Sequence, residues 1–439
     1  MPRYAVIVLA AALGTPAIGA AADWSGMQYP DQLTLPDNIL WPGEGNFPAW
    51  PSQPSSGRNV HAWAGIGLRH DSNLFRLSDS QDTQATLGTS DKSDTVTRLE
   101  AGLQAKIPIS QQNLVFNASI NNNRFNNFSF LNYTGYRAQG AWQWTLGSQW
   151  SGDVGYGRRQ YLANLADLQA PIRDLITVDH AFAGARYALT PRWRIRGELD
   201  GSHYRHNDSS QSSLDSNATT ATFGVDYVSP ITNFAGSPNT IGGQVKLTRS
   251  NFPNQQVVDS DTVDNDYRQI NVSAVASWQI TGKSHIEGLL GYTMLHHDQL
   301  SQRNFSGVTG RLGYDWAVGA KTLLNVTAWR EIQRYEDVAS NYVLSRGISF
   351  GPSWSPTSKL VFQAKWLHDD RDYLGDPGFA LQTGPKRKDT FHGMVVAAGY
   401  SPRRNTKLSM SWEHGIRDSN IFGHDYDYNA VSANVQLNF

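Results

Sequence analysis

Apolar and polar residues alternate over stretches of about ten to fourteen residues, and such stretches recur from Asn59 to Phe439. Side chains on a β-strand point in turn to the two faces of the sheet, so a period of two predicts strands with one apolar and one polar face. In the last stretch Leu437 and Val435 are apolar, whereas Asn438 and Gln436 are polar. Strands of this length can cross a bilayer at a tilt.

The alternation predicts about eighteen strands, with an uncertainty of about two. We expect them near residues 59–76, 96–108, 112–125, 134–147, 149–161, 176–189, 192–206, 217–228, 240–250, 267–280, 284–298, 305–318, 321–334, 341–353, 358–373, 389–400, 405–418 and 427–439. A closing strand must pair with the first strand, so 427–439 is expected to pair with residues 60–69.

The connections between these stretches alternate between short and long. The short ones place Ser or Thr before Pro or Gly, as at Thr190-Pro191, Ser229-Pro230 and Thr281-Gly282, which favours tight turns. The others are longer and polar, such as 77–95 and 162–175. Short turns on one rim and long loops on the other, with an even strand number, are typical of a bacterial outer-membrane barrel. The predicted fold is therefore all-β, a transmembrane antiparallel up-and-down β-barrel.

A soluble β-sandwich is the alternative that the same alternation allows. It would need dry inner faces, yet the polar face carries Arg, Lys, Asp or Glu in one stretch after another. Trp and Tyr near the strand ends are expected to form the aromatic girdles of a membrane barrel. These are Trp142, Tyr156, Trp193, Tyr227, Trp278, Tyr292, Trp316, Tyr400 and Trp412.

The N-terminal part of the chain has a different character. Residues 1–22 combine one Arg, an apolar run and a small-residue site ending at Ala22, the pattern of a cleaved signal peptide. Residues 23–58 are rich in Pro and aromatics and lack a period, which predicts an irregular arm. The arm is expected either to extend into the periplasm or to fold under the pore or dock a partner through Trp24, Trp41, Phe47 and Trp50. The barrel is expected over 59–439, in the outer membrane of a Gram-negative cell.

Composition excludes several other classes of protein. Mean hydropathy is −0.45 and 17% of residues are charged, yet 14 Trp, 18 Tyr and 17 Phe argue against a disordered chain. A net charge of −1 without a basic run gives no reason to expect a nucleic-acid partner. The chain has no cysteine, so disulfides and thiolate metal sites are excluded.

The polar faces of the strands are expected to line the lumen. Basic and acidic residues are nearly balanced there, so strict selection for anions is not predicted. We expect Arg194, Arg196, Glu198 and Asp200 to form an ion-pair ladder across the lumen, or alternatively to contact substrate. The candidates for lining the lumen are Arg98, Lys106, Arg137, Arg194, Arg196, Glu198, Asp200, Arg311 and Asp315.

Patterns that resemble catalytic or metal sites do not fit a barrel. Gly347–Gly351 matches G-x-S-x-G but lies within an expected strand, where no nucleophile elbow can form. His296 and His297 are adjacent in a strand and point to opposite faces. Acidic loops expected at 259–266 and 369–372 lack the EF-hand pattern, although they could bridge to lipopolysaccharide through divalent cations. We therefore predict no catalytic, cofactor-binding or metal-binding residues, and no enzyme.

One segment resembles a known family. His70-Asp-Ser-Asn-Leu-Phe-Arg-Leu-Ser-Asp79 is similar to the D-[DS]-N-L-[FY]-R segment of EpsL-type exopolysaccharide-associated outer-membrane proteins, a β-barrel porin family. The motif residues are Asp71, Asn73, Leu74, Phe75 and Arg76. They could cap the rim, fix a loop inside the mouth, or form a purely structural turn. The terminal Phe439 resembles the assembly signal that the barrel-insertion machinery recognises.

The resemblance implies export of exopolysaccharide through a polar lumen. The partners expected on this basis are outer-membrane lipid and lipopolysaccharide, exopolysaccharide, the barrel-insertion machinery and possible periplasmic export components. Two alternatives remain open at this point. One is a general diffusion porin for small solutes, and the other is a plugged structural or adhesive surface barrel. A surface enzyme is a third alternative, for which the sequence shows no catalytic triad.

Overall fold

The computed structural model of the protein describes residues 59–232, 238–254, 256–258, 261–299, 301–334, 342–374 and 386–439. The predicted signal peptide (1–22) and the predicted arm (23–58) lie outside the described residues, as do the arm's Trp24, Trp41, Phe47 and Trp50. Both stay predictions.

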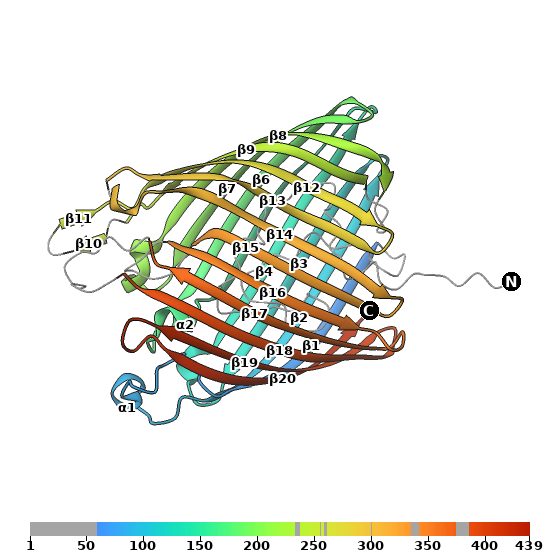
Figure 1. The fold of residues 1–439 in the computed structure, drawn as a ribbon. Helices are drawn as coiled ribbons and strands as arrows, with labels where there is room; N and C mark the ends of the chain where they lie inside the picture. The colour runs from blue at the N-terminus through green and yellow to red at the C-terminus, as the bar shows by residue number, and fades with distance from the viewer. Residues whose placement is uncertain are drawn as a thin grey trace.

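Eighteen strands form one sheet, and each lies where the alternation predicted a strand (Figure 1). A separate two-stranded hairpin, β10 with β11, lies on the connection between β9 and β12. The strands are β1 (Val60–Asp71), β2 (Asp94–Ile109), β3 (Gln112–Phe125), β4 (Tyr133–Leu146), β5 (Trp150–Leu162), β6 (Leu175–Thr190), β7 (Trp193–His206), β8 (Ser216–Thr232), β9 (Pro238–Asn251), β10 (Gln256–Val258), β11 (Asp261–Val263), β12 (Tyr267–Thr281), β13 (Ser284–His297), β14 (Phe305–Gly319), β15 (Thr322–Arg334), β16 (Tyr342–Trp354), β17 (Leu360–Asp372), β18 (Lys388–Arg403), β19 (Thr406–Ser419) and β20 (Tyr426–Asn438).

The sheet closes on itself. Strands that follow one another in the barrel pair antiparallel, and β20 pairs with β1 from Trp63↔Asn438 to Asp71↔Ala430. Closure leaves no strand edge without a partner, which a sheet in lipid requires. The predicted pairing of the last strand with residues 60–69 is thereby confirmed, and so is the predicted antiparallel barrel. Among the described residues, no helix is both long and apolar enough to span a membrane.

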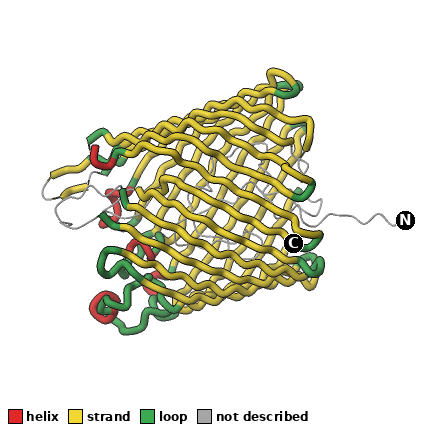
Figure 2. The backbone as a smooth tube through the Cα atoms, in the orientation of Figure 1, coloured by secondary structure: helices red, strands yellow, loops and turns green. Residues whose placement is uncertain are grey.

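The two rims differ as the connections predicted. Figure 2 shows the helices gathered at one end of the barrel, on the long connections; we call this end the long-loop rim. It carries α1 (Thr83–Leu87), α2 (Leu165–Leu168) and the short 3-10 helices η2 (Ser129–Leu131), η3 (Ser209–Leu214) and η4 (Ser301–Arg303). The opposite end, the short-turn rim, has tight turns such as Ser110–Gln111, where Ser110 has a φ of 56°. In outer-membrane barrels the long loops are extracellular and the short turns periplasmic.

Burial of side chains in the barrel wall is the reverse of that in a soluble protein: apolar side chains are outside and polar ones inside. Large apolar side chains are exposed on the outside, including Leu199 (55%) and Leu312 (55%). Neighbouring residues of the other parity are buried inside, including Arg98 (5%) and Asp226 (3%). An apolar outer band around a polar interior is stable only where the outside is lipid. A soluble sandwich is therefore excluded by the placement of the side chains.

Several details of the sequence prediction are wrong. The first strand ends at Asp71 rather than at residue 76, because residues 72–76 turn away from the sheet. Residues 369–372 belong to strand β17 and do not form a loop. Two expected girdle aromatics, Tyr156 and Trp412, lie at the middle of β5 and β19 rather than near an end.

Their mid-strand position has a structural reason. The strands continue beyond the apolar band toward the long-loop rim, and the next outward residues after Tyr156 and Trp412 are Arg158 and His414. Tyr156 therefore lies at the upper edge of the apolar band on β5, whereas on β19 the exposed Ile416 follows His414. Near the short-turn rim, Trp193 and Trp316 lie within a few residues of a strand end, as predicted.

Candidate functional site

The predicted lumen-lining residues share one face of the sheet. All lie on the parity opposite to the exposed apolar side chains, and so point to the inside: Arg98, Lys106, Arg137, Arg194, Arg196, Glu198, Asp200, Arg311 and Asp315. The same face adds charged residues that were not among the predicted lumen-lining candidates: Arg69, Arg371, Arg417, Asp71, Asp94, Asp369 and Asp389. Three further arginines against four aspartates leave the wall nearly balanced in charge.

Ion pairs on this face run along the wall. Arg194 Nε lies 2.9 Å and Arg196 Nε 3.2 Å from Asp226 Oδ2, which joins β7 to β8. Asp200 Oδ2 lies 3.0 Å from His180 Nε2, which joins β7 to β6. The predicted ladder across the lumen is therefore wrong. Neighbouring strands are about 4.8 Å apart, whereas the opposite wall of a barrel this wide lies beyond the reach of an arginine.

Three other predicted inner-face charges, Arg311, Asp315 and Arg98, also have partners on the wall. Arg311 donates to both carboxylate oxygens of Glu331 (3.2 and 2.6 Å), linking β14 to β15. Asp315 accepts from Asn325 Nδ2 at 2.8 Å. Arg98 Nε donates to Glu100 Oε2 at 3.0 Å within β2. Because acids and bases neutralise each other locally, the inner face presents polar groups without a strong net field.

Amides and hydroxyls fill the space between these pairs. Asn271 Nδ2 donates to Thr293 Oγ1 at 2.7 Å, and Thr293 Oγ1 lies 2.6 Å from Thr309 Oγ1, so three neighbouring strands share one chain of hydrogen bonds. Polar side chains that are satisfied in this way can lie buried at little cost.

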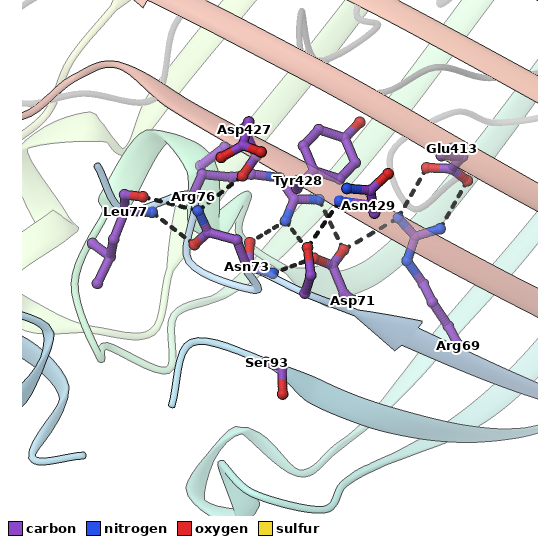
Figure 3. A network of polar contacts seen from close by, with 12 residues as sticks. Arg69, Asp71, Asn73, Arg76, Leu77, Ser93, Glu413, Asp427, Tyr428 and Asn429 are labelled. Carbon is purple, nitrogen blue, oxygen red and sulfur yellow. Dashed lines mark hydrogen bonds and ion pairs between the residues drawn. The ribbon is translucent and has the colours of Figure 1, made fainter. Parts of the chain in front are cut away.

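Residues 71–76, the motif of the resemblance, form a corner at the long-loop rim, next to the seam where β1 meets β20 (Figure 3). Arg76 Nη1 and Nη2 donate to the two oxygens of Asp71 at 2.6 and 2.9 Å. Arg69 Nη1 and Nη2 donate to the two oxygens of Glu413 at 2.8 and 2.9 Å, which ties β1 to β19 across β20. The guanidinium of Arg76 also stacks on Tyr428, with Cζ 3.5 Å from the ring centroid. We call these five residues the seam cluster.

Asn73 closes the turn that follows β1. Its Nδ2 donates to the carbonyl oxygens of Leu77 (2.8 Å) and Asp427 (3.0 Å), and its Oδ1 accepts from the Leu77 N–H at 2.9 Å. The backbone N–H of Asn73 donates to Asp71 Oδ1 at 3.1 Å. Arg76 has a φ of 57°, in the left-handed region, and the contacts of its side chain with Asp71 and Tyr428 stabilise that conformation.

Apolar residues of this segment fix the loop at the long-loop rim. Phe75 and Leu77 are fully buried, and Phe75 meets Phe128 edge to face with ring centroids 4.9 Å apart. Leu74 packs against the same cluster, and its N–H donates to the carbonyl of Lys92 at 2.9 Å. The sequence left three roles open for this motif. Its contacts are those of a structural turn that fixes the loop after β1. The polar groups of Asp71 and Asn73 are hydrogen-bonded to Arg76, Leu77 and Asp427.

Electrostatics support the corner. Burial works against the charged form of Arg76, but the charge and hydrogen bonds of Asp71 outweigh it, so the pKa of Arg76 is raised above its usual value.

A histidine in a neighbouring loop also has a shifted pKa. In the loop between β19 and β20, burial is the largest cause that lowers the pKa of His424, to about 4, and the nearby Arg387 and Arg417 lower it further.

A second arginine cluster on the inner face was not predicted. Arg387 donates to both oxygens of Asp389 (Nε at 3.0 Å, Nη2 to Oδ2 at 2.6 Å), and its Cζ lies 4.2 Å from the Tyr373 ring centroid. Arg417 Nε donates to the carbonyl of His424 at 2.8 Å. Sequence spacing offers one signal: Arg387 and Asp389, like Arg69 and Asp71, are two residues apart and so share a face.

The patterns set aside as catalytic remain without a catalytic arrangement. Gly347–Gly351 lies within β16, with no turn or helix after its serine. His297 is buried on the inside, whereas His296 is on the outer face and contacts Asn304 Nδ2 at 3.0 Å. Across the described part of the chain, no three His, Cys, Asp or Glu side chains form a group suited to a metal ion. The loop expected at 259–266 is only partly described, since residues 259 and 260 are not.

The fold and the two faces define the class of the protein as a closed outer-membrane-type β-barrel. Comparison by sequence family agrees for part of the chain: residues 255–439, less than half of it, match the family model described as "Putative beta-barrel porin 2". No curated protein matches the sequence.

Solved porin structures resemble the fold only distantly. OpdK of Pseudomonas aeruginosa with vanillate has 10% identity and a TM-score of 0.47, covering 87% of this chain and 99% of its own. OccAB3 of Acinetobacter baumannii has 9% identity and a TM-score of 0.47, covering 87% and 100%. OccK2 (OpdF) of P. aeruginosa in complex with glucuronate has 10% identity and a TM-score of 0.48, covering 87% and 98%. At this distance the ligands of those proteins are no guide to those of this chain.

Proposed function

We propose that the protein is a diffusion porin of the outer membrane for small polar solutes. The observation that carries this proposal is the inner face of the closed 18-stranded barrel: it is lined by amides, hydroxyls and locally neutralised ion pairs. A barrel of this strand number is wide enough to hold an aqueous channel. A wall without a strong field admits neutral and charged polar solutes with modest preference.

Export of exopolysaccharide is less well supported. The resemblance that implied it rests on the motif at Asp71–Arg76, and the contacts of that motif are internal to the corner. The family match at 255–439 names a porin and no polymer. A polar wall that accommodates sugar hydroxyls is compatible with both functions, so the experiment must separate them.

Planar-bilayer conductance of the purified protein tests the proposal. We expect stable ion conductance and, in liposome-swelling assays, entry of neutral sugars that falls steadily with their size. Block of the conductance by polysaccharide fragments, but not by small sugars, would favour export instead. Absence of conductance, also after deletion of residues 23–58, would overturn the channel and favour a plugged structural or adhesive barrel.

A matched pair of variants connects conductance to the inner wall. Arg196→Gln removes an inner-face charge paired with Asp226, so we expect a shift of ion selectivity toward cations. Arg268→Gln removes an outer-face arginine at the long-loop rim, whose side chain is 63% exposed, and is expected to leave selectivity unchanged. Equal selectivity of both variants and the unmodified protein would show that Arg196 is not in the ion path.

A further inference from the structure

Two arginines lie side by side on the outer face near the long-loop rim. Arg158 on β5 is opposite Asp179 on β6, and Arg205 on β7 is two positions from the residue opposite Asp179. They share the outward parity with Tyr156, which is 51% exposed. With Tyr136 on β4, these residues form what we call the outer arginine patch.

One carboxylate holds the patch together. Arg158 Nη1 lies 3.5 Å from Asp179 Oδ1, and Arg205 Nη2 donates to Asp179 Oδ2 at 3.2 Å. Arg158 Nε donates to the hydroxyl of Tyr136 at 3.2 Å, and the hydroxyl of Tyr156 donates to Asp179 Oδ1. Two guanidinium groups share a single carboxylate, so the patch carries one excess positive charge.

The arginine side chains keep donors free for a further anion. They are 43% and 49% exposed, respectively. Each guanidinium has five N–H donors in a planar fork, and the contacts with Tyr136 and Asp179 occupy only some of them. The fork matches two oxygens of a phosphate.

The patch lies at the depth of lipid headgroups. On the strands that carry it, the outward residues closer to the short-turn rim are lipid-facing, such as Val154 (47% exposed) and Leu199 (55%). The tyrosines mark the boundary between this apolar band and water, where tyrosine is enriched in membrane proteins. An anion held here therefore has an apolar surface directly beside it, on the side of the membrane core.

Another outward arginine at this rim has a different balance. Arg346 on β16 is opposite Asp370 and lies 3.1 Å from Asp372 Oδ2, and Lys388 Nζ lies 3.7 Å from the same carboxylate. Two basic and two acidic side chains make this group locally neutral, so Arg346, whose side chain is 52% exposed, is a matched control on the same outer face and rim.

We propose that the outer arginine patch binds the phosphate of an anionic lipid headgroup, with the acyl chains of that lipid lying along Val154 and Leu199. The apolar band favours a lipid over free phosphate, because only a lipid covers that surface as well as pairing with the guanidinium groups. Arg158 and Arg205 would each supply N–H donors, while Asp179 keeps the two side chains in place.

Lipid binding by the delipidated protein in detergent tests the proposal, with native mass spectrometry as readout and phosphorylated lipopolysaccharide as probe. The double variant Arg158→Gln/Arg205→Gln is expected to lose affinity about ten- to thirtyfold. Arg346→Gln is expected to bind as the unmodified protein does. Heat-modifiable migration on a gel confirms that every variant is folded.

Two further arms identify the ligand. The same lipid without its phosphates is expected to bind the unmodified protein as weakly as the phosphorylated lipid binds the double variant. Millimolar inorganic phosphate is expected not to displace the phosphorylated lipid; displacement would overturn the lipid assignment in favour of a free-anion site. Equal lipid binding by the double variant and the unmodified protein would refute the patch as a binding site.

Discussion

Replacing Asp71 by Asn is expected to destabilise the corner at the seam between β1 and β20. The carboxylate accepts two hydrogen bonds from Arg76, at 2.6 and 2.9 Å, and their side chains are only 3% and 11% exposed. Asp71→Asn leaves the guanidinium of Arg76 buried without its counter-charge. Removing one partner of a buried pair costs about 3–5 kcal/mol, and burial this complete leaves little screening by solvent.

Hydrogen exchange measures that loss directly. The amide N–H groups of Leu74 and Leu77 donate to the Lys92 carbonyl and to Asn73 Oδ1, both at 2.9 Å, and are exposed only when the corner opens. A loss of about 3–5 kcal/mol corresponds to exchange that is faster by about two to four orders of magnitude.

The control is Asp79→Asn in the same loop. Asp79 pairs with Lys92 at 2.8 Å, but its side chain is 89% exposed, so the effect of the substitution is expected to be under about 1 kcal/mol. In a double-mutant cycle, Asp71→Asn combined with Arg76→Gln should cost less than the sum of the single variants, with a coupling of about 1–3 kcal/mol. Equal exchange in Asp71→Asn and Asp79→Asn would refute the structural role assigned to the motif.

Other predictions concern the outer face, pH and processing. Leu199→Arg places a charge on the lipid-facing band and should lower the free energy of unfolding in vesicles by about 2–4 kcal/mol, whereas Leu199→Phe should be tolerated. Because the pKa of His424 is lowered to about 4 in the folded loop, the unfolded loop binds more protons between about pH 6.5 and 4, and protection of the loop against exchange should fall as pH drops through that window. His424→Gln should remove this dependence; an unchanged pH profile would contradict it. Phe439→Ala should slow insertion without lowering the stability of the assembled barrel, because the side chain is 61% exposed, and a slowed appearance of the heat-modifiable band would show it. The mass of the purified protein should correspond to a chain that begins near Asp23.

The strands were predictable because their two faces meet different solvents. Alternation over about ten residues requires lipid on one side of Leu199 and a polar interior beside Glu198, so both the strands and their parity could be read from spacing. Closure followed from the same reasoning, since no strand edge can remain open in lipid. The end of the first strand was misplaced, because residues 72–76 continue the sequence pattern while the backbone turns at Asn73.

The spacing of residues in the sequence could not predict which charges pair, for a geometric reason. The partner of an inner-face charge is fixed by the register of neighbouring strands: Arg194 meets Asp226, 32 positions away, and Arg69 meets Glu413, 344 positions away. The sequence places such residues on one face but does not specify which of them are adjacent, so a cross-lumen ladder could be expected where the wall holds lateral pairs. The same geometry separates structure from function here. A charge whose partner is on the next strand holds the wall together. Under the proposed porin function, the width and polarity of the channel would therefore select solutes more than any single arginine.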